Sequence, residues 1–522
     1  MTANLLSYIK EKLKMQLFRE RLGKPMKKYV KKITSCVLIL VMTICAAGCT
    51  QTTKSSEQSL DSLLDPQNPT TVTVWNYYNG DQLSAFENLV SKFNETIGAS
   101  KGIVAVSVSL GSINNLADSL IDAVNGKAGA EDIPSIAAVY AETAYILEQQ
   151  SAIIELNKYF SDSEIEEYIP SFIEEGRLVE DGPIMICPVS KSTEIFAVNS
   201  TDWEAFEKST GISYDNIDTY EELTATAKAY YEYTDGLTPD VLEDGKALYG
   251  RDSVANYVFV GTRQLLGHEL FTATADGVTV DMNKDVFRTL WDNYYIPYIN
   301  GYFAANTSHR SEDMKTGSII SLTCSTSGVN YLSNTVTELD DTKHSININL
   351  YKPLHFKNGE DIAVQQGAGY SILKTSDAEQ YAASVFLKWF TDTEQNLDFS
   401  VMSGYSPVKK SANDVNLIES AYKSINTTNV NDKDNVIDSL KISSELYSTS
   451  ETYTNKPFEG SKDVRDLLGT ALEDACKNDR AAVLERIAAG MSREAAVAEF
   501  STDEYFNKWF DQLTNNVNHI IK

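Results

Sequence analysis

The side chains that most often do chemistry in proteins are sparse in this chain and lack the spacing of catalytic or metal-binding motifs. The five histidines are His268, His309, His344, His355 and His519. None belongs to an HExxH zinc motif, and the sequence contains neither a GxSxG turn nor a phosphate-binding P-loop. The stretch DMNKDV, residues 281–286, begins like a calcium loop but has Val286 where the turn glycine is required. We therefore predict no metal, no cofactor and no catalytic residue.

Carboxylates are the one abundant reactive group, with 73 Asp and Glu in 522 residues. A glycoside hydrolase needs two of them facing each other, about 5–10 Å apart, across a sugar-sized cleft. Spacing along the chain does not show which carboxylates face each other, so a lipid-anchored hydrolase stays an alternative at this point. A scaffold or adhesin is a third class, and it predicts a flat exposed patch in place of a cleft.

Cys49 is the cysteine with the most informative surroundings. It follows a basic stretch at residues 27–32, a 15-residue apolar run at 33–47, and then Gly48. This pattern is typical of a secretory signal and is short for a membrane span, which needs about 20 residues. The sequence AAGC resembles the lipobox of bacterial lipoproteins, with Ala46 where leucine is usual, and this resemblance implies lipidation of Cys49.

The N-terminal segments divide accordingly. We predict translation from Met26, which makes residues 1–25 an upstream stretch, and a signal peptide at 26–48. Residues 49–69 are rich in Ser, Thr and Gln and have few groups that can pack, so we expect a flexible tether.

Charge narrows the choice of partners. The whole chain has a formal charge of −28, and its first 48 residues contain ten Lys/Arg and two Asp/Glu, which leaves −36 on the remainder. Such a surface disfavours nucleic acid and anionic membranes as partners. Beyond the signal only Cys187, Cys324 and Cys476 remain, an odd and widely spaced set that predicts no disulfide framework.

Hydrophobic periodicity predicts an α/β fold. Strand patterns at 71–78, 102–111 and 134–140 alternate with helical patterns at 81–96 and about 113–124. The order strand–helix–strand–helix–strand favours a parallel sheet with helices on both faces. Further strands are expected within 185–199 and 317–325, and as one strand at 364–373. Helices are expected at 219–234 and 378–392 and through most of 480–517. About 450 residues exceed one simple core, so we expect two lobes.

The colinear series of these segments resembles the family 1 extracellular solute-binding proteins of bacterial ABC importers. The similar stretches are TVTVWNYYNG, PSIAAVY, VSKSTEIFAVN, GSIISLTCSTSGVNYL, QGAGYSILKTS and SGYSPVKKSA. The last resembles the family's Gly-Tyr-x-Pro-Val signature, and the similarity is greatest to the glycerol-3-phosphate and oligosaccharide binders.

The resemblance implies a two-lobed fold, each lobe a sheet flanked by helices, joined by a hinge that the chain crosses several times. It places residues 70–194 and 363–404 in lobe 1, and 195–362 and 405–522 in lobe 2. It implies a monomeric, lipid-anchored protein outside a Gram-positive cell that captures a mono- or oligosaccharide by lobe closure and delivers it to permease subunits. A glycerol-3-phosphate or other polyol-phosphate ligand is the alternative.

In such a fold the ligand lies at the carboxyl ends of strands. The expected ligand-binding residues are therefore Trp75, Tyr77, Tyr78, Tyr140, Glu142, Ser192, Thr193, Ser325, Ser327, Gly367, Gly369 and Tyr405. The aromatic faces stack on sugar rings, and the polar groups bond to sugar hydroxyls. Phe458 is expected where the glycerol-phosphate binders use an arginine, and this expectation favours a neutral sugar.

Overall fold

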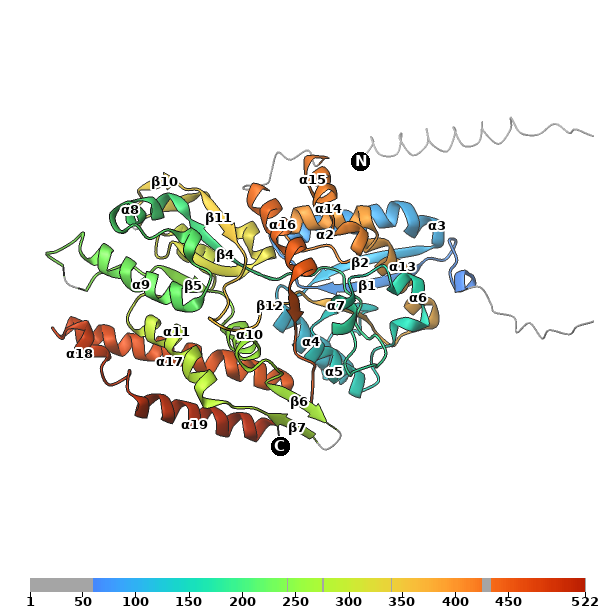
Figure 1. Cartoon of the computed structure of the whole chain (residues 1–522). Helices are drawn as coiled ribbons and strands as arrows, with labels where there is room; N and C mark the ends of the chain where they lie inside the picture. The colour runs from blue at the N-terminus through green and yellow to red at the C-terminus, as the bar shows by residue number, and fades with distance from the viewer. Residues whose placement is uncertain (1–59, 242, 275–276, 339, 425–432, 522) are drawn as a thin grey trace, which may run out of the picture. The chain divides into compact units, whose positions relative to one another are not determined.

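The first sheet contains the N-terminal strands. In the computed structural model, which describes residues 60–241, 243–274, 277–338, 340–424 and 433–521, β1 (Thr70–Asn76) pairs in parallel with β2 (Ile103–Ser109) and β3 (Ile136–Val139) (Figure 1). The strand β13 (Gly369–Ile372) joins antiparallel to β3 and completes the order β13-β3-β1-β2. The parallel pairing of β1, β2 and β3 is as predicted. The lipidation and signal predictions and residues 49–59 of the predicted tether lie outside the described residues. The rest of the predicted tether, residues 60–69, begins with a 3-10 helix (Leu60–Leu63), in which Asp61 accepts from the Tyr381 hydroxyl at 2.8 Å.

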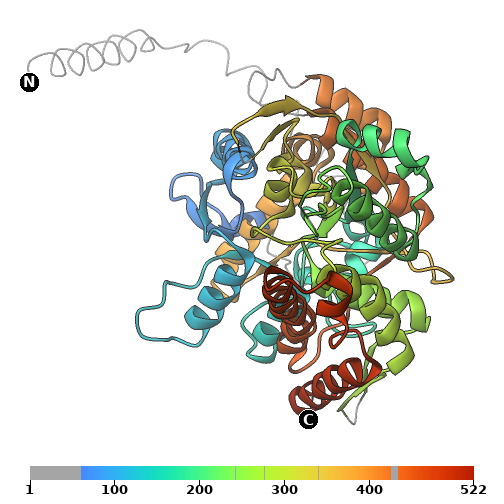
Figure 2. The same cartoon turned by 90° about the vertical axis from the view of Figure 1, so that its left-hand side faces the viewer.

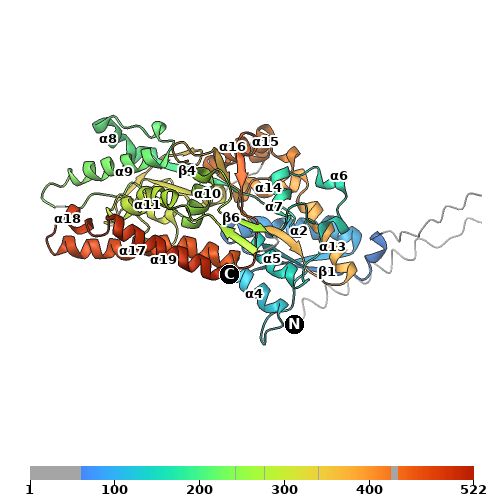
Figure 3. The same cartoon turned by 60° about the horizontal axis from the view of Figure 1, so that its bottom comes forward.

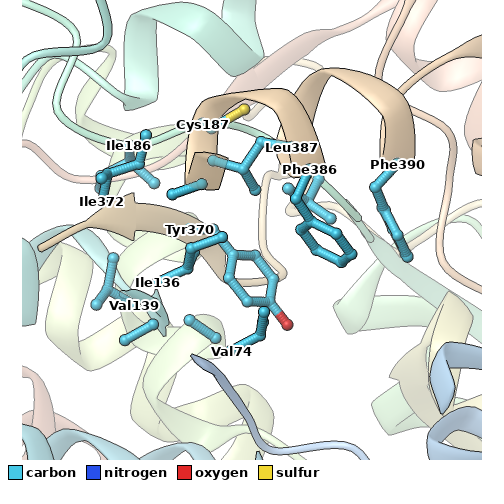
Figure 4. Packing of buried hydrophobic residues seen from close by; sticks show 14 of the residues in the cluster. Val74, Ile136, Val139, Ile186, Cys187, Tyr370, Ile372, Phe386, Leu387 and Phe390 are labelled. Carbon is cyan, nitrogen blue, oxygen red and sulfur yellow. The ribbon is translucent and has the colours of Figure 1, made fainter. Parts of the chain in front are cut away.

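Helices cover this sheet because their apolar positions recur at helical spacing. They are α2 (Gly80–Phe93), α4 (Ile113–Val124), α5 (Ala141–Gln149), α7 (Pro170–Glu175), α13 (Asp377–Phe390) and α14 (Thr393–Ser403). Val74, Ile136 and Tyr370 from the sheet meet Phe386 from α13 in a continuous buried core (Figure 4). Figure 2 shows α4 and the loop that follows it at the left-hand edge of the molecule.

The second sheet has the order β11-β4-β8-β5. Its strands are β4 (Glu194–Asn199), β5 (Tyr249–Arg251), β8 (Ser321–Ser325) and β11 (Ile348–Tyr351). The helices α8 (Ser200–Thr210), α9 (Tyr220–Asp235), α10 (Val254–Leu266) and α11 (Lys284–Ile299) contribute to a second buried core that contains Phe196 and Tyr249 from this sheet. The protein therefore has two lobes, each a sheet flanked by helices, as predicted.

The predicted C-terminal helices are α17 (Ser461–Ala488), α18 (Arg493–Val497) and α19 (Asp503–Ile520). The helices α17 and α19 run side by side in Figures 1 and 3. Trp291 of α11 stacks on Tyr295 with ring centroids 3.5 Å apart and contacts Trp509 of α19 at 4.6 Å. This aromatic packing attaches the C-terminal helices to the second lobe.

The remaining helices and strands lie between these elements along the chain. The helices are α3 (Ala99–Lys101), α6 (Asp162–Ile165), α12 (Arg310–Lys315), α15 (Val415–Ser424) and α16 (Lys433–Thr449). The strands are β6 (Phe271–Thr274), β7 (Gly277–Val280), β9 (Thr335–Thr337), β10 (Lys343–Ser345), β12 (Ile362–Val364) and β14 (Glu451–Tyr453). No helix within the described ranges is long and apolar enough to cross a membrane.

Two stretches differ from the sequence expectation. The expected strand at 364–373 is two strands in different sheets, one ending at Val364 and the next beginning at Gly369. Between them the chain bends at Gly367, which adopts a left-handed conformation (φ +91°). The apolar stretch 185–191 forms no strand and pairs only through single bridges such as Cys187 with Tyr370. Near the rejected calcium loop, Asn283 instead caps α11 by accepting from the backbone N–H groups of Asp285 and Val286.

Candidate ligand pocket

Four chain segments meet between the two sheets, and we call them the crossing junction: residues 190–193, 364–367, 404–407 and 451–453. Their backbones hydrogen-bond to one another. Lys191 exchanges both backbone bonds with Ser406, and Ser192 does so with Gln366. The backbone N–H of Gln365 donates to the carbonyl of Tyr453 at 2.7 Å. Motion of one lobe against the other must therefore pass through these segments.

A buried ion pair lies inside the crossing junction. The ammonium of Lys191, which is 1% exposed, contacts the two carboxylate oxygens of Glu175 at 2.8 and 2.6 Å. The same ammonium donates to the carbonyl of Gly367 at 2.6 Å. Gln365 donates its side-chain N–H to Glu175 and accepts from Thr452. The Glu175 carboxylate at the end of α7 thus binds side chains from two junction segments, 190–193 and 364–367. Gln365 links it to a third segment, 451–453.

A pocket opens beside this ion pair, at the carboxyl end of β3. It is lined by Tyr140, Ala141, Glu142, Glu175, Asn256, Phe259, Val260, Val364, Gln365, Gln366, Tyr453, Thr454, Asn455 and Arg465. Its volume of about 30 Å³ has room for only one or two water molecules. Ligand pockets are usually about 300–1,000 Å³, so a sugar enters only if the lobes separate.

A cluster of three tyrosines, Tyr77, Tyr78 and Tyr405, adjoins the crossing junction, and we call it the tyrosine wall. The hydroxyls of Tyr77 and Tyr405 lie 3.0 Å apart, and the Tyr78 hydroxyl lies 3.0 Å from that of Ser190. Burial raises the pKa of Tyr78 to about 12 and that of Tyr77 well above its ordinary value. These phenols therefore stay protonated at physiological pH, and each can donate and accept a hydrogen bond.

The two-lobed fold with a pocket beside the crossing junction agrees with a comparison of the sequence with known protein families. The chain matches the bacterial extracellular solute-binding proteins over residues 88–425, well over half of its length. The chain belongs to this family. No curated protein sequence matches it.

Solved structures show the same fold at low identity. The solute-binding protein is similar to UgpB from Mycobacterium tuberculosis in complex with glycerophosphocholine, with 15% identity and a TM-score of 0.62 over 87% of this chain and 98% of that one. It is also similar to the cyclic alpha-maltosyl-1,6-maltose binding protein from Arthrobacter globiformis, with 17% identity and a TM-score of 0.58 over 86% and 99% of the two chains. The protein Lmo0181 from Listeria monocytogenes, in complex with cycloalternan, gives 13% identity and a TM-score of 0.59 over 86% and 100%.

Several expected site residues of this solute-binding protein come together. Tyr140 and Glu142 line the pocket, and Tyr77, Tyr78 and Tyr405 form the tyrosine wall. Ser192, Thr193 and Gly367 belong to the crossing junction. Ser325 accepts from the backbone N–H of Gly328 and lies 2.9 Å from the Ser327 hydroxyl. The carbonyl of Ser327 accepts a bond from Gln82 of α2 at 3.3 Å, so this turn touches the first lobe.

Other expected residues lie apart from the pocket. Trp75 is 3% exposed within the first core, and Gly369 lies in β13, where an added Cβ would be 2.4 Å from Ile186. Phe458 packs on Phe271 with centroids 5.2 Å apart and lines a neighbouring groove that also contains Glu142. Ligand contact by each expected residue stays a prediction.

The sequence reasoning missed the amides and the arginine of the pocket. Asn256, Gln366 and Arg465 all line it, yet Asn256 and Arg465 lie near the starts of helices α10 and α17 and do not end a strand. Below them Arg251 forms a 2.5 Å ion pair with Glu194, and both are buried. The one shared sequence signal of Asn256 and Arg465 is a place in the first two turns of a helix that follows a strand, and this signal does not distinguish them from their neighbours on the same helices.

Proposed function

We propose that this solute-binding protein is the substrate-binding component of an ABC importer, and that it captures a mono- or oligosaccharide and delivers it to permease subunits. The observation that carries the proposal is the pocket beside the crossing junction, where ligand contact and lobe movement share the same residues. Glu175 and Gln365 belong to both. A ligand bound there stabilises one arrangement of the lobes over the other.

The lining chemistry supports a sugar. Gln366 and Asn455 line the pocket with amides, which can bond to sugar hydroxyls, and Tyr140 and Tyr453 add aromatic surface. Two of the similar structures named above are of a cyclic alpha-maltosyl-1,6-maltose binding protein and of a protein in complex with cycloalternan. No group of His, Cys, Asp and Glu that could hold a metal ion occurs within the described residues.

A polyol phosphate is the second candidate because of Arg465. Its guanidinium reaches the pocket and donates to the Asn256 side-chain oxygen at 2.8 Å, while the ring of Phe259 lies 5.7 Å away. An arginine in a partly closed pocket is a strong site for phosphate oxygens. Lys456, in contrast, bonds to Glu174 and to the carbonyl of Arg177, and Lys462 pairs with Asp466.

Titration of both ligand classes at low and high salt decides between them. We expect a neutral probe such as maltotriose to bind with an affinity that salt barely changes, whereas glycerol 3-phosphate binding would weaken steeply with salt. Arg465→Met should reduce phosphate binding about tenfold or more. Lys462→Met, which removes a cation from the same helix, is the matched control.

The same titration tests the importer role. Bound sugar should be recovered unshortened, and solution scattering should show a change in the radius of gyration at saturation. Shortened sugar would support the hydrolase alternative. Salt-sensitive binding of glycerol 3-phosphate, with none of any neutral sugar, would overturn the carbohydrate assignment but not the importer role.

Lipid attachment at Cys49 is part of the proposal, because an importer works best when its binding protein stays near the permease. Two or three acyl chains anchor stably where one is marginal. We expect Cys49→Ala to move the protein from the membrane fraction to the medium or the wash. A mutant that stays membrane-bound after a high-salt wash would contradict lipid anchoring.

A further inference from the structure

Two neighbours fix the hydrogen-bond directions around Asn256, because one of them can only accept a hydrogen bond and the other can only donate one. Glu194 is ion-paired with Arg251 and accepts the Asn256 side-chain N–H at 3.0 Å. Arg465 can only donate, and it donates to the Asn256 side-chain oxygen at 2.8 Å. Since a carboxylate faces one end of the amide and a guanidinium the other, the 2%-exposed amide of Asn256 has one favourable orientation.

This orientation determines how Gln366 faces the pocket. The second N–H of Asn256 donates to the Gln366 side-chain oxygen at 2.8 Å. The Gln366 amide must therefore accept on the Asn256 side, which leaves its NH₂ group for the pocket that it lines. That NH₂ group has no partner among the described residues, and Gln366 is only half-buried.

We propose that Asn256 is a positioning residue that sets the polarity of the pocket: it turns the donors of Gln366 and Arg465 toward the ligand, which must present hydrogen-bond acceptors there. The inference rests on the proposed function for its ligand but not for its geometry. It selects oxygen-rich ligands, whether hydroxyl, ether or phosphate, and disfavours an ammonium group at this position because two sets of donors would face each other.

The first test needs no ligand. In protein produced from Thr50 onward, which contains the whole compact unit Leu60–Lys522, side chains are labelled with ¹⁵N-glutamine. The Gln366 NH₂ signals are assigned by their loss in Gln366→Glu. We expect their protons to exchange with water about as fast as those of a free amide. Strong protection of the Gln366 NH₂ protons would overturn the proposal, because it would place them against Asn256.

A matched pair of neighbouring glutamines gives the second test. Gln365 donates to the Glu175 carboxylate, whereas Gln366 accepts from Asn256, so the same substitution should destabilise the protein to different extents at the two positions. We expect Gln365→Glu to lower the melting temperature by about 2 °C or more, because two carboxylates would face each other. Gln366→Glu keeps an acceptor toward Asn256 and should lower it by less. Equal losses would contradict the assigned polarity.

The third test measures how ligand binding depends on the Asn256–Gln366 hydrogen bond. Asn256→Asp cannot donate to Gln366, and Asn293→Asp is a control that places a carboxylate at a buried asparagine of the same lobe, on α11. With maltotriose and glycerol 3-phosphate as probes, we expect Asn256→Asp and Gln366→Glu to weaken binding about tenfold or more and Asn293→Asp to leave it near wild type. If neither probe binds the wild-type protein, the proposed ligand is wrong, while the exchange and melting tests still decide on the polarity.

Discussion

Gly367→Ala should lower the free energy of unfolding by about 3 kcal/mol or more and abolish ligand binding. Gly367 has φ +91°, a region that side chains rarely adopt, and an ideal Cβ would lie 2.7 Å from the Ser190 carbonyl and 3.1 Å from the Lys191 Cα. The strain and the clash both occur inside the crossing junction, where the segments are joined by backbone hydrogen bonds. Urea unfolding followed by circular dichroism measures the loss.

Gly111→Ala separates the two causes. Gly111 also has a left-handed conformation (φ +78°), but nothing lies within 4 Å of its ideal Cβ. Its substitution should cost only the conformational term, about 1–2 kcal/mol. If both variants lose the same free energy of unfolding, the close packing around Gly367 does not contribute to the cost of its substitution.

Lys191→Met is the second change with a large expected effect. It leaves the Glu175 carboxylate buried without its cation, which typically costs about 3–5 kcal/mol. Lys158→Met is the surface control: Lys158 pairs with Asp377 at 2.8 Å, but the two side chains are 42% and 71% exposed. An exposed pair contributes about 0–1 kcal/mol, so this variant should stay close to wild type.

A double variant tests whether the charge itself is responsible. Lys191→Met with Glu175→Gln removes both charges and keeps an oxygen that can accept from Gln365. We expect it to be more stable than Lys191→Met alone, because no unpaired charge is buried. A double variant as unstable as the single one would show that the lost packing of the Lys191 side chain, and not the charge, sets the cost.

The fold was predictable where hydrophobic periodicity is strong. The valines of residues 71–78 and 102–111 alternate, and these segments form the paired strands β1 and β2. Periodicity failed at 364–373, because the pattern of VQQGAGYSIL does not show that the chain turns at Gly367 and continues in another sheet. The stretch 185–191 is apolar for a different reason: it packs into the first core without strand partners.

The site was predictable only in part. Residues that end strands could be found by pattern, and Tyr140 and Glu142 do line the pocket. Asn256, Gln366 and Arg465 could not, because their role depends on contacts between distant segments: Gln366, Arg465 and Glu194 all bond to the Asn256 side chain. Single amides carry no sequence signature, since asparagine and glutamine are also common on ordinary surfaces.

The antiparallel strand β13 also has a consequence for how the chain folds. It supplies residues 369–372 to a sheet whose other strands end at residue 139, and the whole second sheet is encoded between them. The first sheet therefore cannot be completed until most of the polypeptide has been synthesised, and contacts of such sequence separation form slowly. On the proposal that residues 26–48 are a signal peptide, this late completion would favour export of the chain before it folds.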